Sequence, residues 1–112
     1  MITEITGHDF EEEVVQCDIP VFACFTRSEC GSCFALHLVT ESLAREYEGR
    51  VKFVRIDVEQ EPELAAKYRI IPLPAMILFR DSEPVKRLLG FQERWVLGDL
   101  LDMLTAKKER LV

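Results

Sequence analysis

The sequence lacks any apolar stretch long enough to cross a membrane, because a spanning helix needs about 20 consecutive, mostly apolar residues. Its first residues, Met1-Ile2-Thr3-Glu4, also lack the basic start and apolar segment of a signal peptide. We therefore expect a cytoplasmic protein without a membrane partner, while a mature form cut from a longer precursor stays open. No repeat or low-complexity tract divides the chain, which indicates a single domain over residues 1–112.

The chain has fewer basic than acidic residues, 14 Lys and Arg against 20 Asp and Glu, which gives a net charge of −6. Binding to nucleic acid requires a basic stripe that releases counterions, so this balance argues against a nucleic-acid partner. The one basic cluster, Lys107-Lys108-Glu109-Arg110, is expected to complement the negative end of a last helix. Hydrophobic residues make up 48% of the chain, which is enough for one hydrophobic core. We also expect the protein to be a monomer.

The four cysteines, in a chain without an export signal, do not indicate a disulfide framework. Two of them form the tetrad Cys30-Gly31-Ser32-Cys33, which follows an apolar run and precedes a helical pattern. A helix N-terminus offers partial positive charge and free N–H groups, and both favour a thiolate on the first cysteine. The spacing therefore predicts reversible thiol–disulfide exchange.

The other cysteines and the histidines leave alternatives open. A zinc or iron–sulfur site would need further ligands from Cys17, Cys24, His8 or His37, but the chain has no second CxxC and no HxxxH, and we predict no metal. Cys24 lies inside an apolar run, where it is either a small buried hydrophobe or a third redox thiol. Cys17 is expected in a partly exposed loop, as a surface thiol or a site of glutathionylation or intermolecular pairing.

Hydrophobic periodicity predicts alternating strands and helices. A helix capped by Asp9 is expected to end near Cys17, and Gly49 is expected to end the helix that follows the tetrad. A last helix carries Trp95 with leucines at helical spacing, which predicts a core position for Trp95. The predicted strands cover residues 21–25, 51–58, 75–79 and 85–89, with a turn at 81–83, and a short helix covers 62–68.

This order of elements, with the tetrad after the first buried strand, resembles the thioredoxin family over roughly Ile5 to Leu104. The stretch 54–62, Tyr68-Arg69-Ile70, Pro74 and Gly90 keep the family's register. The resemblance implies a thioredoxin fold, an α/β fold with a central mixed sheet flanked by helices on both faces. It also implies a disulfide oxidoreductase without a cofactor that acts on protein or small-molecule disulfides and is restored by a thioredoxin-reductase-like electron donor.

The resemblance also implies roles for individual residues. Cys30 would attack the substrate, and Cys33 would be the buried resolving thiol. Pro74 would be a cis-proline opposite the disulfide, which leaves the backbone of Leu73 free to pair with an extended substrate; cis peptides are almost confined to X–Pro bonds. Gly31, Ser32, Leu73 and Gly90 would together form the substrate-binding surface.

The chain departs from the family's pattern around the redox pair. Glu29 stands where the family usually has Trp, and Ser32 stands where it usually has Pro. Cys24 stands in place of a buried Asp, and Arg55 in place of its Lys neighbour. Leu38 replaces a proline that bends the helix, and Phe34 replaces a residue that is often basic. The redox pair is kept while its surroundings have changed.

Two further expectations follow from the helix after the tetrad and the strand beside it. His37 lies one helical turn beyond Cys33, so its ring is expected to lean toward Cys33 and to accept the Cys33 proton; the alternative is a histidine without a catalytic part. Arg55 either faces the underside of the site or is an edge charge in solvent. A rival function is a redox-inactive binding module with a groove around Phe34, Leu73 and Phe91.

Overall fold

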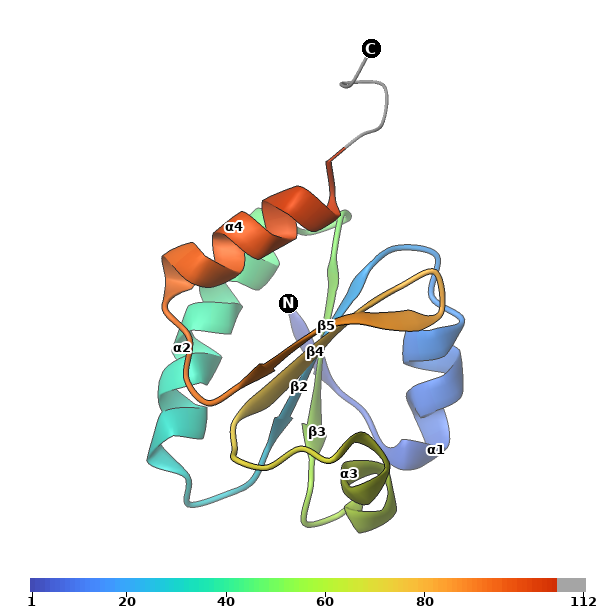
Figure 1. The fold of residues 1–112 in the computed structure, drawn as a ribbon, viewed down its shortest axis with the longest axis vertical. Coiled ribbons are helices and arrows are strands. Elements are labelled where there is room, and N and C mark those ends of the chain that lie inside the picture. The colour runs from blue at the N-terminus through green and yellow to red at the C-terminus, as the bar shows by residue number, and fades with distance from the viewer. Residues whose placement is uncertain (107–112) are drawn as a thin grey trace.

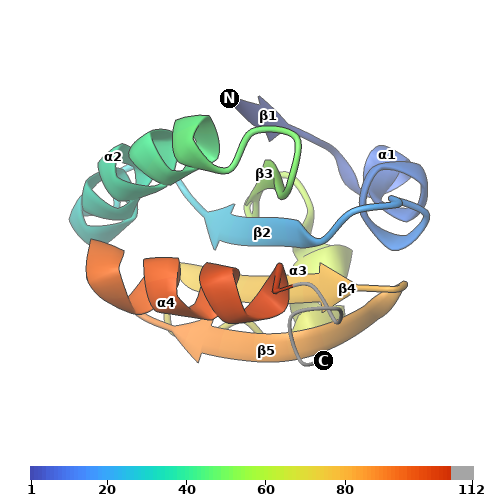
Figure 2. The same ribbon diagram turned by 90° about the horizontal axis from the view of Figure 1, so that it is seen from above.

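A computed structural model describes residues 1–106, which form a five-stranded sheet flanked by helices (Figure 1). The strand order is β1-β3-β2-β4-β5, with β1 and β2 parallel to β3, β4 antiparallel to β2, and β5 antiparallel to β4; Figure 2 shows this order. The predicted mixed sheet is therefore confirmed. The strands are β1 (Ile2–Glu4), β2 (Val21–Thr26), β3 (Lys52–Asp57), β4 (Ala75–Arg80) and β5 (Glu83–Leu89).

Helices cover both faces of the sheet, as predicted, with α2 and α4 on one face and α1 and α3 on the other (Figure 1). None of the helices in residues 1–106 is long and apolar enough to span a membrane. The helices are α1 (Gly7–Phe10), which continues into a π-helical turn η1 (Glu11–Val15), α2 (Gly31–Glu46), α3 (Pro62–Tyr68) and α4 (Arg94–Leu104).

Strand β2 is buried along its whole length, because both of its faces contact a hydrophobic cluster. Successive side chains of a strand point to opposite faces. Val21, Ala23 and Phe25 therefore join the cluster under α1 and α3, whereas Phe22 and Cys24 join the cluster under α2 and α4. The unbroken apolar run that predicted this strand reflects burial on two sides.

Helix α4 lies against α2 through polar contacts as well as leucines. The Tyr47 hydroxyl, at the end of α2, donates to the Gly98 carbonyl at 3.2 Å and also to the carboxylate of Asp102. Arg94 donates to Ser42 Oγ at 3.2 Å, also between α4 and α2. Burial and the hydrogen bond to Asp102 raise the pKa of Tyr47 to about 12, so this hydroxyl keeps its proton as a donor.

The N-terminal prediction was incomplete. Strand β1, which pairs with β3, was not predicted, because a strand of three residues is too short to show alternation. Asp9 is not the helix cap: α1 begins at Gly7 after Thr6, and the Asp9 carboxylate accepts a hydrogen bond from Thr6 Oγ1 at 3.2 Å. The cap assignment failed because Asp9 lies in the first turn, where a carboxylate is also favourable.

The hairpin between β4 and β5 is tighter than predicted. Asp81 and Ser82 have φ values of 55° and 71°, so the turn needs only these two residues and Glu83 already pairs with Arg80 in the sheet. The basic cluster at 107–110 lies outside the described residues, so its role at the end of the last helix stays a prediction.

The predicted core position of Trp95 was wrong. Its side chain is 69% exposed, whereas Leu97 and Leu101 of the same helix are completely buried. Trp95 precedes Leu97 by two residues, which places it about 200° around the helix from the buried face. The leucines predict the buried face of α4, but the spacing of Trp95 from Leu97 puts Trp95 on the opposite side.

We expect Leu97→Ala to lower the free energy of unfolding by about 2–5 kcal/mol, because it leaves a cavity between α4 and the sheet. The matched variant Trp95→Ala removes a larger side chain from the exposed face of the same helix and should cost about 0.5 kcal/mol or less. Urea denaturation followed by circular dichroism measures both. An equal loss in the two variants would contradict the assignment of the buried face.

Candidate active site

The redox tetrad lies at the end of the sheet where the parallel strands β2 and β3 finish and the antiparallel strand β4 begins. Thr26, the last residue of β2, pairs with Asp57 at the end of β3, and Phe25 pairs with Ala75 at the start of β4. Pro74 directly precedes β4, and its carbonyl accepts a hydrogen bond from the Gly90 N–H at 2.7 Å. The loop that leads to Cys30, the end of β3, Pro74 and Gly90 thus share this end of the sheet.

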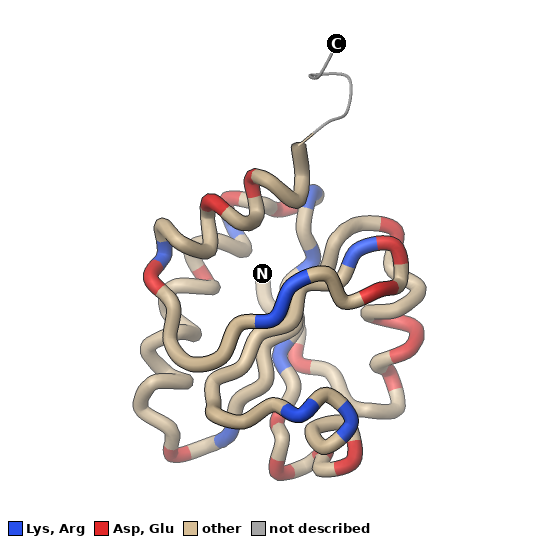
Figure 3. The backbone as a smooth tube through the Cα atoms, viewed as in Figure 1, with Lys and Arg blue, Asp and Glu red and all other residues tan. Residues whose placement is uncertain are grey.

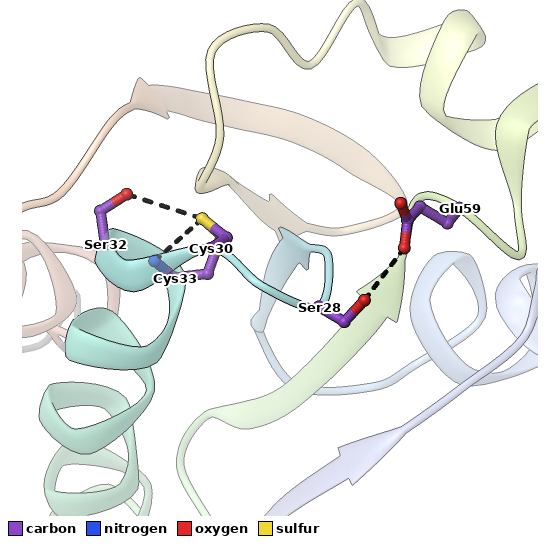
Figure 4. The surroundings of a disulfide bond; sticks show 5 residues. All are labelled: Ser28, Cys30, Ser32, Cys33 and Glu59. Carbon is purple, nitrogen blue, oxygen red and sulfur yellow. Dashed lines mark hydrogen bonds between the residues drawn. A yellow bond between two sulfur atoms is a disulfide. The ribbon is translucent and has the colours of Figure 1, made fainter.

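Cys30 and Cys33 are joined as a disulfide, with their Cα atoms 5.2 Å apart. Cys30 is the N-cap of α2, and its Sγ accepts a hydrogen bond from the Cys33 backbone N–H at 3.2 Å (Figure 4). The hydroxyl of Ser32 lies 3.6 Å from the same sulfur. Cys30 is half-buried, Cys33 is only 4% exposed, and Gly31 and Ser32 are exposed. An attacking molecule therefore reaches Cys30 before Cys33.

The Leu73–Pro74 peptide is cis, as the resemblance implied, and the Ile71–Pro72 peptide is also cis, which was not predicted. Pro74 is buried, Leu73 is half-buried, and Ile71 is 83% exposed. Leu73 also lines an apolar pocket of about 630 Å³ beside α3. The other residues that line this pocket are Val58, Ala65, Ala66, Arg69, Ile70 and Ile71.

A small cavity lies beneath Cys33. Its walls include Cys24, Cys33, His37 and Arg55, and its volume of about 10 Å³ is close to what one water molecule needs. Cys24 is 6% exposed, as expected of a buried small residue. Burial raises the pKa of the Cys24 thiol to about 12, although the positive charge of Arg55 acts in the opposite direction. Cys24 is therefore a neutral thiol at physiological pH.

Arg55 joins three elements beside this cavity. Its guanidinium donates to Glu4 Oε1 in β1 at 3.0 Å and lies 3.2 Å from His37 Nδ1 in α2. A guanidinium has only donors, so Nδ1 accepts this hydrogen bond and the ring proton is on Nε2. His37 Nε2 lies 3.2 Å from Glu41 Oε2. His37 therefore borders the cavity with Cys33, as expected, but both of its ring nitrogens contact other side chains.

Sequence reasoning missed Glu4 as part of the site, because its place depends on the unpredicted strand β1. In β1, Glu4 pairs in register with Arg55, which brings the two side chains together. Within residues 1–106, no group of three or more His, Cys, Asp or Glu side chains is arranged to hold a metal ion. The groups that this site offers for chemistry are thiols, an imidazole, a guanidinium and carboxylates.

The comparisons with known proteins agree with this geometry. The thioredoxin family model matches residues 1–103. The chain belongs to the thioredoxin family. It is 35% identical over 101 residues to thioredoxins of Staphylococcus aureus strains Mu50, MW2 and N315, which covers 90% of this chain and 95% of each relative.

This thioredoxin homologue is thus a protein-disulfide oxidoreductase with the Cys30–Cys33 disulfide as its redox centre. The structure also locates the departures from the family's pattern. Glu29 and Phe34 are both exposed beside the disulfide, and Leu38 is exposed one turn further along α2. Cys24 and Arg55 lie together at the cavity beneath Cys33. The residues that depart from the family's pattern therefore lie both on the exposed surface near the disulfide and at the cavity beneath Cys33.

The two remaining cysteines should differ sharply in reactivity. With the Cys30–Cys33 disulfide intact, we expect an aromatic disulfide reagent at pH 8 to label Cys17 in the native protein. Cys24 should not react until denaturant is added, because its pKa of about 12 leaves only about 10⁻⁴ of it as thiolate and its side chain is buried. Counting the released chromophore gives the two stoichiometries. Cys17→Ser should abolish native labelling, and labelling of Cys24 in the native Cys17→Ser protein would contradict this assignment.

Proposed function

We propose that this protein is an atypical, CGSC-type thioredoxin that reduces or exchanges disulfides of proteins or small molecules as a cytoplasmic monomer formed by one domain, residues 1–112. A thioredoxin-reductase-like enzyme or another thiol donor returns the pair to the dithiol. The observation that carries the proposal is the unequal exposure of the two cysteines: Cys30 is accessible at the start of α2, whereas Cys33 is buried one turn further in.

In the proposed reaction, the Cys30 thiolate attacks one sulfur of the substrate disulfide, and the other substrate sulfur leaves as a thiolate. Cys33 loses its proton and attacks the Cys30 sulfur of the mixed disulfide, which releases the second substrate thiolate and closes the Cys30–Cys33 disulfide. The Cys33 N–H aimed at Cys30 Sγ supports the first step, since a hydrogen-bond donor at a helix N-terminus stabilises a thiolate. Ser32 Oγ offers a second donor.

An extended substrate would lie along the backbone of Leu73, between the disulfide and Gly90. The hydrogen bond between Gly90 and Pro74 supports this placement, because it holds the segment before β4 beside the end of β5. The apolar pocket under Leu73 and Ile71 provides a place for a hydrophobic side chain of the substrate. Gly31 and Ser32 are exposed and complete the surface around Cys30.

His37 is the proposed base for the second step. Among the side chains that line the cavity beneath Cys33, Cys24 is held neutral by its raised pKa and Arg55 has no lone pair. His37 Nδ1, in contrast, carries a lone pair that can accept a proton. It accepts the Cys33 proton on Nδ1, directly or through one water, when Arg55 releases that nitrogen. The Arg55 charge then stabilises the Cys33 thiolate.

The roles of the two cysteines can be separated by trapping. We expect Cys30→Ala to abolish disulfide reduction, and Cys33→Ser to accumulate mixed disulfides through Cys30, because the resolving thiol is missing. The measurement is insulin reduction for activity and non-reducing electrophoresis with mass spectrometry for the adducts. Cys30→Ser with Cys33 intact is the matched control and should trap little. Equal trapping in both variants would reverse the assignment.

We expect His37→Ala to slow resolution of the mixed disulfide by about 10²-fold at pH 7, the lower end of what general base catalysis contributes. The pH profile of the resolution rate should also differ between the parent protein and the variant, because the variant lacks the base. Stopped-flow release of the second thiol measures both. His8→Ala, in α1 on the opposite face, is the control. An unchanged rate and pH profile in His37→Ala would exclude His37 as the base.

A further inference from the structure

A third pocket, the largest of those described, lies beside the disulfide and is lined by residues of β1, β3 and the loop before α2. It has a volume of about 670 Å³, within the usual range for small-molecule sites. Both Cys30 and Cys33 line it, so a molecule in this pocket lies next to the redox centre. Phe34, which is 66% exposed, contributes an apolar side chain to the wall, and the lining also includes the charged residues Glu4, Arg27, Glu29, Arg55 and Asp57.

The charged side chains of this pocket fall into two groups. Arg55 and Glu4 are ion-paired with one another, and an Asp57 carboxylate oxygen accepts a hydrogen bond from a backbone N–H. Arg27 and Glu29, in contrast, make no ion pair or side-chain hydrogen bond with any residue in the range 1–106. Both are exposed, and both precede Cys30 in the loop that joins β2 to α2, where charges of both signs lie close together (Figure 3).

Two features fix the backbone of this loop. Ser28, between them, donates a hydrogen bond to Glu59 Oε1 at 3.2 Å, which ties the loop to the segment after β3 (Figure 4). Glu29 has a φ of 56°, in the left-handed region that residues with a side chain seldom adopt, so the chain turns sharply just before Cys30. One positive and one negative side chain thus line the same pocket as the two redox cysteines.

We propose that this pocket selects low-mass disulfides that carry both an ammonium and a carboxylate group, that is, disulfides derived from amino acids or short peptides. Arg27 pairs with the carboxylate, Glu29 pairs with the ammonium, and Phe34 contacts the carbon chain that leads to the sulfur. This inference rests on the proposed disulfide oxidoreductase function and names one substrate class for it.

The pairing with Glu29 also favours the chemistry. A carboxylate next to Cys30 raises the free energy of the Cys30 thiolate by like-charge repulsion. An ammonium group bound at Glu29 offsets that charge when the substrate disulfide is in place. The Cys30 thiolate then attacks the nearer substrate sulfur, one amino-acid thiolate leaves, and Cys33 displaces the second as the Cys30–Cys33 disulfide forms. Both electrons come from the Cys30–Cys33 dithiol, which a dithiol reductant has restored beforehand.

The experiment uses the full chain, reduced with a dithiol and freed of it, in single-turnover oxidation by five disulfides. Cystine and glutathione disulfide carry both charges, at different distances from the sulfur. Cystamine carries only ammonium groups, dithiodipropionate only carboxylates, and 2-hydroxyethyl disulfide no charge. Acid quenching and alkylation of the remaining thiols give the rate. Each rate in a variant is divided by the rate of the parent protein with the same disulfide, so that the intrinsic reactivities cancel.

Arg27→Gln should slow cystine and dithiodipropionate about twofold to fivefold more than it slows 2-hydroxyethyl disulfide, the size of one exposed ion pair. Glu29→Gln should do the same for cystine and cystamine. Glutathione disulfide should follow cystine if the pocket takes peptides and should follow 2-hydroxyethyl disulfide if it takes only the amino-acid disulfide. Arg27→Lys, which keeps the charge, should restore most of the rate with cystine.

The control variants Arg45→Gln and Glu48→Gln make the same changes of net charge at exposed positions outside the pocket and should leave all five ratios equal. If Arg27→Gln and Glu29→Gln affect all five disulfides equally, they act on the Cys30 thiolate and the recognition proposal is wrong. If no disulfide oxidises the pair in the parent protein, the proposed function itself fails.

Discussion

The site depends on the pairing of strand β2 with β3 on one side and with β4 on the other. This register places Thr26 beside Asp57, and Phe25 beside Ala75, so that the loop to Cys30 leaves the sheet next to Pro74. It is strongly specified because β2 is buried on both faces: a shift by one residue would exchange the side chains that face the two helical layers. The hydrophobic packing of a single strand thus determines where the redox pair lies.

The surroundings of Cys33 combine hydrophobic packing with the charge of Arg55. Arg55 connects β1, β3 and α2 through its contacts with Glu4 and His37, and its field reaches the buried Cys24. Cys24, in contrast, stays neutral because burial outweighs that field. In the described part of the chain, the side chains that line the cavity beneath Cys33 include an imidazole and a guanidinium but no carboxylate. The redox pair is therefore kept, while the charged groups beneath Cys33 differ from the family's pattern.

Local patterns predicted the elements that are long or buried on two sides. The apolar runs predicted β2 and β4 within one residue, and the helical pattern after the tetrad predicted α2. Strand β1 was missed because three residues carry no periodicity, and Glu4 was missed with it. The core position predicted for Trp95 was wrong because its angular position on α4 places it in solvent. These two errors concern features that depend on contacts with other elements: β1 pairs with β3, and the packing of α4 determines which of its side chains are buried.

The candidate site divides in the same way. The spacing of Cys30 and Cys33, with a helix that starts between them, was enough to predict the redox chemistry, because a helix N-terminus acts on its own first residues. The sequence by itself thus determined the redox pair, the buried strand before it and the proline before β4. Only the tertiary structure decided that Glu4, Arg55 and His37 meet beside Cys33, and that Arg27 and Glu29 border a pocket. The physical reason is that these contacts join residues far apart in the chain, and strand pairing and helix packing, not local propensity, bring such residues together.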